Sequence, residues 1–343
     1  MAVDAAQTTL VVGPSWVGDM VMAQSLFMQL KHAHPGIAID VLAPAWSRPL
    51  LERMPEVREA IDMPFRHGEL GLAARYRLGR RLRARRYDWA IVLPNSFKSA
   101  LAPFWARITR RTGYLGELRW GLLNDVRRLD RARLPMTVQR FVALGLAPDA
   151  PVPAQCPAPR LAVSNAQVTA ALQRLGLSPP SKPLLALCPG AEYGPAKRWP
   201  VEYFAALAAA KIAQGWTTWV FGSDKDAALG ETLCARVGAG CVNLAGRTRL
   251  AEAVDLLSLA HAVVSNDSGL MHIAAALDRP LVAVYGSSDP GFTPPLSARA
   301  KLVSLRVECS PCFKRECPYG HYKCLRDLSP ERVLGALDEL PAP

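Results

Sequence analysis

Polar residues interrupt the apolar run VVSNDSGLMHIAAALDRP at residues 263–280, and their types suit a ligand with both charge and hydroxyl groups. Gly269 allows a ligand close to the backbone, and the first amides of the helix expected after it can bind phosphate oxygens. The carboxylate of Asp267 would repel phosphate, so we expect Asp267 and Ser268 to cap the helix or bind sugar hydroxyls. His272 follows one turn later and could hydrogen-bond a diphosphate, although a single histidine in an apolar helix is more often a core residue.

A second polar segment, CPGAEYGPAKRWP, places Lys197 and Arg198 just ahead of Trp199 and Pro200. Pro200 fits the first position of the next helix, so the two cations precede a helix N-terminus, which normally disfavours positive charge. A bound anion between the cations and the helix amides would explain this placement. The alternative is two ordinary surface cations. We interpret Trp199 as a packing residue at the start of the helix.

The first strand runs into GPSWVGD, where Gly13 and Gly18 have the glycine spacing of a P-loop. Asp19 and Met20 stand where a P-loop has Lys and Ser or Thr, so an ATPase is poorly supported. Asp19 has two interpretations that the sequence leaves open. It is either an N-cap or first-turn acid favoured by the helix dipole, or a general base that takes a proton from a hydroxyl.

The cysteines of the C-terminal region form the pattern C-x2-C-x4-C-x6-C. Four close cysteines in an intracellular protein favour a structural zinc site, and the alternative is reduced thiols or an oxidation-labile element. The remaining cysteines are isolated in sequence and are interpreted as small core residues. The candidate zinc ligands are Cys309, Cys312, Cys317 and Cys324, with His321 inside their span.

Positive charge is concentrated in residues 66–140, which hold 17 Arg and one Lys against five acidic residues, a net charge of +13. Within residues 75–88 the pattern predicts a helix with Leu78 and Leu82 on one face and arginines around the rest. Such a helix is either a solvated surface or a contact for a polyanion: nucleic acid, a phosphorylated lipid headgroup or an acidic glycan.

Strands and helices must alternate along the chain to position these segments. With 343 residues, half of them hydrophobic and a fifth charged, we expect two folded α/β domains rather than a disordered chain. A proline-rich stretch at 148–159 predicts the boundary, with domains at 1–160 and 161–343 and the final helix packing back on the first domain. Buried parallel strands are predicted at 8–13, 37–43, 88–93, 184–188, 217–222, 262–266 and 281–286.

Two Rossmann-like, doubly wound parallel sheets in tandem place ligand sites at the carboxyl ends of the strands, facing a central cleft. The polar segments follow predicted strands at these positions. The N-terminus lacks the basic and apolar pattern of a signal peptide, and no stretch is long and apolar enough for a transmembrane helix, so a cytoplasmic protein is expected.

Taken together, three segments resemble the ADP-heptose:lipopolysaccharide heptosyltransferases, a family of GT-B glycosyltransferases. They are GPSWVGDMVMAQSL, PGAEYGPAKRWP and NDSGLMHIAAALDRPLVAVYGSSDPGFTPPL. The resemblance covers nearly the whole chain and implies a GT-B fold. It implies an inverting transfer of heptose from ADP-L-glycero-β-D-manno-heptose onto the first heptose of the lipopolysaccharide inner core, on a phosphorylated lipid A-Kdo-heptose acceptor.

The resemblance also implies residue roles. Asp19 matches the general base, with Ser15 and Gly18 on the acceptor side, and Lys197 matches the basic residue at the donor diphosphate. The donor-binding positions are Arg198, Asp226 near the ribose, Thr248 near the adenine, Asp267, Ser268, Gly269 and His272. An inverting transfer needs a base and a way to stabilise departing ADP, which cations and helix amides can supply without a catalytic metal. No cofactor beyond the structural zinc is therefore expected.

Two other functions remain open from the sequence. A sibling enzyme of the same family would add the first or a later core heptose. A basic nucleic-acid-binding protein with a zinc cluster belongs to a different class, but the basic segment lacks interleaved aromatic residues and carries no recognised nucleic-acid motif. We therefore expect a transferase at the inner face of the inner membrane, with no nucleic-acid partner.

Overall fold

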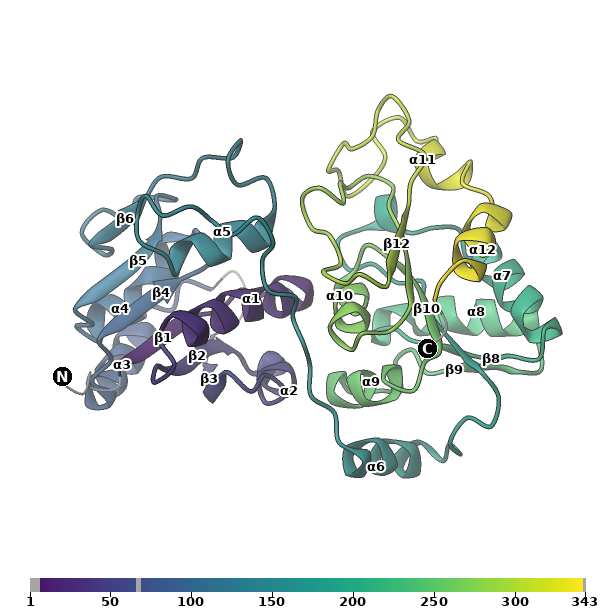
Figure 1. Ribbon diagram of the computed structural model, residues 1–343, viewed down its shortest axis with the longest axis horizontal. Coiled ribbons are helices and arrows are strands. Elements are labelled where there is room, and N and C mark those ends of the chain that lie inside the picture. Colours follow the sequence, from purple (N-terminus) through teal and green to yellow (C-terminus); the bar gives the residue numbers. More distant parts are fainter. Residues whose placement is uncertain (1–6, 66–68, 342–343) are drawn as a thin grey trace. The chain divides into compact units, whose positions relative to one another are not determined.

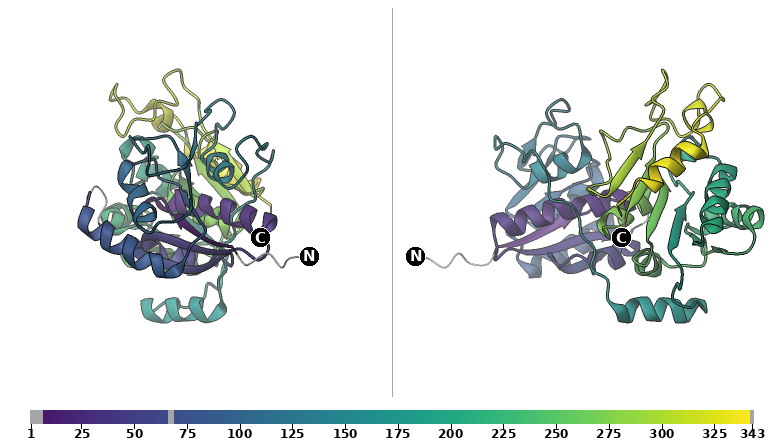
Figure 2. Two further views of the ribbon diagram at one scale, coloured as in Figure 1. Left: turned by 90° about the vertical axis from the view of Figure 1, so that its left-hand side faces the viewer. Right: turned by 45° about the vertical axis from the view of Figure 1, so that its right-hand side comes forward.

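The computed structural model describes residues 7–65 and 69–341, in two compact units divided between Pro159 and Arg160 (Figure 1). In each unit a parallel β-sheet carries helices on both faces (Figures 1 and 2). The fold is therefore α/β with two doubly wound sheets, as the alternation of strands and helices predicted. Among the described residues, no helix combines the length and hydropathy that a membrane span requires.

The sheet of the N-terminal unit has the order β3-β2-β1-β4-β5-β6. Its strands are β1 (Thr8–Val12), β2 (Ala38–Pro44), β3 (Val57–Met63), β4 (Trp89–Val92), β5 (Arg110–Tyr114) and β6 (Asp125–Arg127). Its helices are α1 (Val17–Ala33), α2 (Arg48–Leu51), α3 (Leu72–Leu82), α4 (Leu101–Trp105) and α5 (Thr137–Leu144), with 3₁₀ turns η1 (Ala45–Ser47), η2 (Arg83–Arg85) and η3 (Phe97–Ala100). Helices α1 and α5 pack together, and so do α3 and α4.

The predicted helix at 75–88 corresponds to α3 and η2. Leu78 and Leu82 are buried against the sheet, as predicted. The expectation that arginines surround the rest of the helix is wrong at Arg75, which is buried on the same side and donates hydrogen bonds to backbone carbonyls. A guanidinium can be buried there because its fork of donors meets several acceptors at once.

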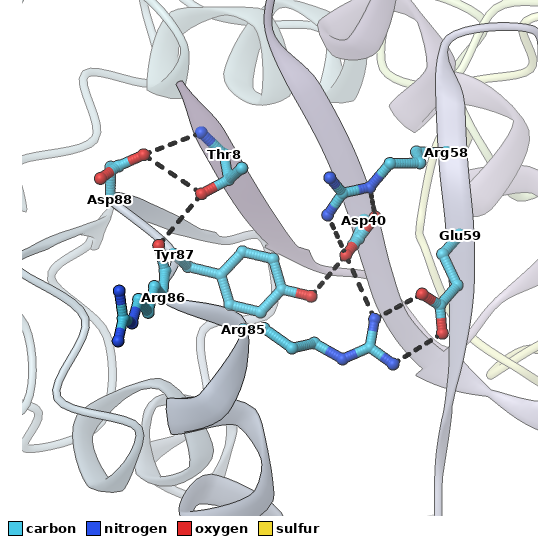
Figure 3. A network of polar contacts seen from close by, with 8 residues as sticks. All are labelled: Thr8, Asp40, Arg58, Glu59, Arg85, Arg86, Tyr87 and Asp88. Carbon is cyan, nitrogen blue, oxygen red and sulfur yellow. Dashed lines mark hydrogen bonds and ion pairs between the residues drawn. The ribbon is translucent and has the colours of Figure 1, made fainter. Parts of the chain in front are cut away.

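A polar network joins the amino-terminal parts of the strands in this unit (Figure 3). Asp40 on β2 is fully buried and accepts hydrogen bonds from Tyr87, at 2.5 Å, and from Arg58, at 2.7 and 2.8 Å. Arg85 donates to Glu59 on β3 and lies 3.5 Å from Asp40. Arg85 of the basic segment therefore balances the unit's own carboxylates.

The sheet of the C-terminal unit has the order β12-β11-β10-β7-β8-β9. Its strands are β7 (Leu184–Cys188), β8 (Thr217–Val220), β9 (Cys241–Asn243), β10 (Ala262–Asn266), β11 (Leu281–Val284) and β12 (Ala300–Val303). Its helices are α6 (Asn165–Leu175), α7 (Val201–Ala213), α8 (Ala227–Val237), α9 (Leu250–Leu257), α10 (Gly269–Ala276), α11 (Lys323–Arg326) and α12 (Pro330–Asp338), with 3₁₀ turns η4 (Pro195–Lys197) and η5 (Asp224–Asp226).

Helix α12 packs against α7 and strands β11 and β12. Val333 and Leu337 of α12 join the core cluster that also contains Phe204 and Val282. The final helix thus has a hydrophobic partner in its own unit, and its return to the N-terminal domain stays a prediction.

Candidate functional site

The candidate residues of the C-terminal unit follow the carboxyl ends of strands β11, β10, β7, β8 and β9, which are neighbours in the sheet. Parallel strands bring their carboxyl ends to one edge, so segments far apart in sequence meet there. This edge gathers the segment before α7, the segment before α8 and the start of α10.

Lys197, Asp267 and Ser288 form one cluster at this edge. The Lys197 Nζ lies 2.5 Å from Asp267 Oδ2, and the Ser288 hydroxyl donates to the same oxygen, also at 2.5 Å. Asp267 is 5% exposed, and Lys197, which is itself mostly buried, compensates its charge. Of the two roles expected for Asp267, capping of α10 is wrong, because the carboxylate contacts Lys197 and Ser288 and no side-chain hydrogen bond caps the helix. Binding of sugar hydroxyls stays a prediction.

Ser268 occupies the N-cap position of α10, and its hydroxyl lies 3.3 Å from the hydroxyl of Ser265. Gly269 is the first residue of the helix. No capping side chain bonds the first-turn amides of α10, and amides at such a helix end can bind an anion.

His272 lies in the first turn of α10, 5% exposed, and its Nδ1 has no hydrogen-bond partner among the described residues. Burial lowers the pKa of His272 to about 4, with Asp267 acting to raise it and Lys197 to lower it. The ring is therefore neutral near pH 7. It combines the burial of a core histidine with an unsatisfied polar atom, which is typical of a residue that bonds water or a ligand.

Asn266 connects the two loops that flank this cluster. Its amide donates to the Pro189 carbonyl at 2.7 Å, and its Oδ1 accepts from the Trp199 backbone amide at 3.0 Å. Trp199 is buried against Phe204, which confirms its interpretation as a packing residue. Pro200 is the N-cap residue of α7, one position earlier than predicted.

Arg198 and Asp226 form a second ion pair, with Arg198 Nη2 3.8 Å from Asp226 Oδ1. Asp226 also accepts hydrogen bonds from the amide and hydroxyl of Ser223. A Cβ on Gly190 would lie 2.5 Å from the Asp226 carboxyl group, so glycine is needed for this approach. Arg198 thus bonds a carboxylate of its own unit, as Lys197 does.

Thr248 lies between β9 and α9, half-buried, with its hydroxyl 3.5 Å from the Leu244 carbonyl. The same segment contacts the end of β8 through a hydrogen bond from the Gly246 amide to the Gly222 carbonyl. Thr248 therefore belongs to the strand-end loops that surround Asp226, which follows β8.

The N-terminal unit has its own cavity of about 590 Å³ at the carboxyl ends of β1 to β4. Gly13 and Ser15 line it after β1, Trp46 after β2, and Lys98 after β4. The Lys98 ammonium has no hydrogen-bond or ion-pair partner among the residues described here. A tryptophan and a cation around one cavity suit a sugar that carries negative charge.

Asp19 lies in the first turn of α1, and Trp16 is the N-cap residue. Gly18 and Asp19 are both partly exposed, and Ser15 is exposed at the rim of the cavity. The first-turn position agrees with one of the two interpretations of Asp19. Asp19 lies four residues after Ser15, which lines the cavity, and its role as a general base stays a prediction.

Comparison with known proteins assigns the family. The model of glycosyltransferase family 9 (heptosyltransferase) matches residues 75–323. Lipopolysaccharide heptosyltransferase 2 of Salmonella typhimurium is 51% identical, over 96% of this chain and 97% of that protein. This chain belongs to glycosyltransferase family 9. Lipopolysaccharide heptosyltransferase 2 of Escherichia coli is 49% identical, over 96% of this chain and 97% of that protein.

The fold of this family 9 glycosyltransferase agrees with a solved structure, that of E. coli ADP-heptose lps heptosyltransferase II. The two chains superpose with a TM-score of 0.87 at 46% identity, over 97% of this chain and 98% of that one. The expected GT-B architecture is confirmed by this match together with the two parallel sheets.

Several site residues of this glycosyltransferase were missed from sequence. Ser288 bonds Asp267, and the neighbouring Ser287 is 1% exposed with an unsatisfied hydroxyl. Both follow β11, and their position after a predicted strand was the available signal. Lys98 was the one lysine among 18 cations in residues 66–140, which could have singled it out.

The cysteine segment of the glycosyltransferase bonds two strand-end loops of the C-terminal unit, those after β7 and β11. Phe313 donates its amide to the Ser287 carbonyl at 2.7 Å, and Ala196 donates to the Arg315 carbonyl at 3.0 Å. The four cysteines and His321 line a cavity of about 10 Å³. Burial, together with the three other cysteines, raises the pKa of Cys324 to about 11.

Within residues 7–65 and 69–341, however, His, Cys, Asp and Glu side chains form no group of three that is arranged to hold a metal. Outside the cluster, Cys188 is buried, as expected of a core residue, whereas Cys234 and Cys241 are half-buried and their sulfur atoms lie 2.8 Å apart.

Proposed function

We propose that this protein is an inverting heptosyltransferase that moves L-glycero-D-manno-heptose from ADP-heptose onto the first heptose of the lipopolysaccharide inner core. The observation that carries the proposal is the ion pair of Lys197 and Asp267 together with the neutral His272, at the N-terminus of α10. It is a site for a diphosphate next to sugar hydroxyls, in a chain about half identical to lipopolysaccharide heptosyltransferase 2.

On the donor side, the departing ADP gains negative charge as the bond from its oxygen to the anomeric carbon breaks. Lys197 and the first amides of α10 stabilise that charge, and neutral His272 supplies a hydrogen bond without adding a buried positive charge. Asp267 holds Lys197 in place and leaves its remaining lone pairs for heptose hydroxyls. Asp226 and Thr248 bind the ribose and the adenine.

On the acceptor side, a hydroxyl of the acceptor heptose attacks the anomeric carbon on the face opposite ADP, which inverts the configuration. Asp19 accepts the hydroxyl proton as the new bond forms. Residues 1–160 act as the acceptor domain and residues 161–343 as the donor domain. Lys98 and Trp46 line the acceptor cavity, where the lysine pairs with acceptor phosphate and the indole packs on a sugar face.

The acceptor is a phosphorylated lipid A-Kdo-heptose glycolipid, so the protein works in the cytoplasm at the inner face of the inner membrane. Its association there is peripheral. The exposed arginines of α3 supply attraction to an anionic surface.

A structural zinc ion at the four C-terminal cysteines is a separate part of the proposal. Tetrahedral ligation needs each sulfur about 2.3 Å from one ion, so binding would draw the thiols together around their cavity. Protein purified without chelators should carry about one zinc per chain by elemental analysis, and Cys309→Ser with Cys312→Ser should lose it. Metal-free wild-type protein would reject the zinc site.

Acceptor choice tests the proposed reaction. The protein is incubated with ADP-heptose and with lipid A-Kdo cores that carry no heptose, one heptose or two, and the products are read by mass. The one-heptose core should gain a single heptose, and the others should remain unchanged. Transfer to the heptose-free core or to the two-heptose core would assign the protein to a sibling activity, and no transfer to any core would reject the proposal.

A further inference from the structure

Two large hydrophobic side chains are held out in solvent between β5 and β6. Leu118 is 80% exposed and Trp120 is 63% exposed. Between them Arg119 is buried and donates to the Pro94 carbonyl at 2.7 Å, to the Ser99 hydroxyl and to the Tyr114 carbonyl. Arg119 therefore fixes the segment from inside, so the exposure of its neighbours is a feature of an anchored loop.

Helix α3 presents a matching outer face. Leu72 and Tyr76 are exposed near its start, and Arg77, Arg80 and Arg81 are exposed further along. The spacing places these residues on one side of the helix, opposite the buried Leu78. None of the three arginines has a hydrogen-bond or ion-pair partner among the described residues. The face is therefore apolar at one end and cationic at the other.

Helix α4 packs against α3 in the N-terminal unit (Figure 1), and Arg111 lies between its Phe104 ring and the segment that follows Trp120. The rings of Tyr76 and Trp105 are 5.6 Å apart, and the next residue, Phe104, is exposed. Arg111 lies 5.7 Å from the Phe104 ring and donates to the Leu122 carbonyl at 2.6 Å. We call the outer side of α3, Phe104 and residues 118–120 the Trp120 face.

Both ends of the Trp120 face are anchored to the wall of the acceptor cavity. Arg75, on the buried side of α3, donates to the Lys98 carbonyl at 3.1 Å. Arg119 donates to the Pro94 carbonyl, which lies near the start of the segment between β4 and Lys98. Pro94 and Lys98 both line the cavity. Whatever binds the Trp120 face is therefore held next to the place where the acceptor sugars would enter.

We propose that the Trp120 face docks this protein on a bilayer of anionic phospholipid. Tryptophan, tyrosine and leucine partition into the headgroup region, and arginines beside them pair with anionic headgroups. A nucleic acid would use the arginines but would give no reason to expose Leu118. The inference rests on the proposed function, because a lipid-linked acceptor explains why a docking face adjoins the acceptor cavity.

Vesicle flotation of the full-length chain tests the docking face. Wild-type protein should float with vesicles of phosphatidylethanolamine and phosphatidylglycerol, and much less with phosphatidylcholine alone. Leu118→Ser with Trp120→Ser should weaken binding to the anionic vesicles roughly tenfold, since two inserted side chains are lost. Leu302→Ser, at a 48% exposed leucine on β12, is the matched control and should bind as wild type.

The charged part of the face has a second matched pair. Arg80→Gln with Arg81→Gln should weaken binding to the anionic vesicles, and Arg236→Gln with Arg332→Gln, at exposed positions of the C-terminal unit, should not. Equal binding of the Leu118/Trp120 variant and wild type would overturn the proposal. Equal binding of wild type to both kinds of vesicle would also overturn it. So would a result in which added DNA displaces wild type and both variants equally from the anionic vesicles.

Transfer assays separate this inference from the proposed function. The Leu118/Trp120 variant should transfer heptose to a deacylated, water-soluble core at the wild-type rate, which also shows that it is folded. Its transfer to the same core in lipid form, embedded in vesicles, should fall with the loss of binding. Wild-type protein that transfers to neither acceptor would reject the proposed function, whereas an equal rate of both proteins on embedded acceptor would reject the docking face alone.

Discussion

Asp267 shows how the meaning of one side chain depends on its partners. Its carboxylate next to an anion-binding helix end looks unfavourable in sequence, and the structure resolves this by placing Lys197 2.5 Å away. The two residues are 70 positions apart. Sequence could identify each as a strand-end residue, but their pairing follows from the adjacency of β7 and β10 in the sheet. The ion pair with Lys197 was therefore not predicted, and the donor-binding role of Asp267 stays a prediction.

His272 gives a pH prediction at the same scale. Its pKa is about 4 in the folded protein, against an ordinary value near 6.5, so the unfolded chain binds more protons between these values. The contribution of this residue to the unfolding free energy is therefore complete above about pH 6.5 and is lost as the pH falls toward 4. Lowering the pH from about 7.5 to about 5.5 should cost about 1 kcal/mol through this residue.

Selective labelling of the histidines, with an NMR titration, measures this directly. The His272 ring should titrate near pH 4, and His272→Gln should reduce the pH dependence of the unfolding free energy over that range. A His272 midpoint near 6.5 would contradict the buried, neutral ring.

Secondary-structure elements differ in how clearly the sequence predicts them. The predicted strands correspond to β1, β2, β4, β7, β8, β10 and β11, which have neighbours on both sides. Their apolar runs reflect burial on both faces of the sheet. The missed strands include the edge strands, such as β3 with the sequence VREAIDM, where polar residues face solvent. Strand β5, RRTGY, was missed inside the sheet because its arginines bond neighbouring groups.

The basic segment shows a second limit of sequence reasoning. A net charge of +13 suggests a large cationic surface, yet Arg75, Arg83, Arg111 and Arg119 donate to backbone carbonyls within the unit. These contacts depend on tertiary structure and have no sequence signature. The exposed arginines of the segment include Arg77, Arg80 and Arg81 on the outer side of α3.

Asp40 tests the structural role of the network at the sheet (Figure 3). Asp40→Asn removes the charge that Arg58 and Tyr87 contact in a buried position, so the unfolding free energy of the N-terminal unit should fall by about 1–3 kcal/mol. Denaturant titration of the variant measures the change.

Glu59→Gln is the control, because Glu59 pairs with Arg85 near the surface and should contribute at most about 1 kcal/mol. An Asp40 variant as stable as the wild type would show that the network does not support the fold.

At the scale of the whole molecule, two units of similar architecture carry different chemistry. The C-terminal unit gathers lysine, helix amides and a neutral histidine, which suit a departing diphosphate. The N-terminal unit has a cavity lined by a lysine and a tryptophan, and an aspartate in the first turn of α1. Alternation of strands and helices predicted the two sheets, and the ligand of each unit, which the resemblance of three segments implies, stays a prediction.

The division of roles predicts that binding and turnover separate in variants. Asp19→Asn should abolish heptosyl transfer, since it removes the base, while ADP-heptose binding stays near wild type. Lys197→Ala should weaken ADP-heptose binding and also raise the barrier to transfer by roughly 2–4 kcal/mol, because it removes a preorganised charge at the leaving group.

The most direct test is to measure ADP-heptose affinity by calorimetry and single-turnover transfer on the same preparation of the Asp19→Asn protein. We expect affinity unchanged and no detectable transfer to the one-heptose core. Transfer at the wild-type rate would contradict the account, because proton removal would then not depend on Asp19.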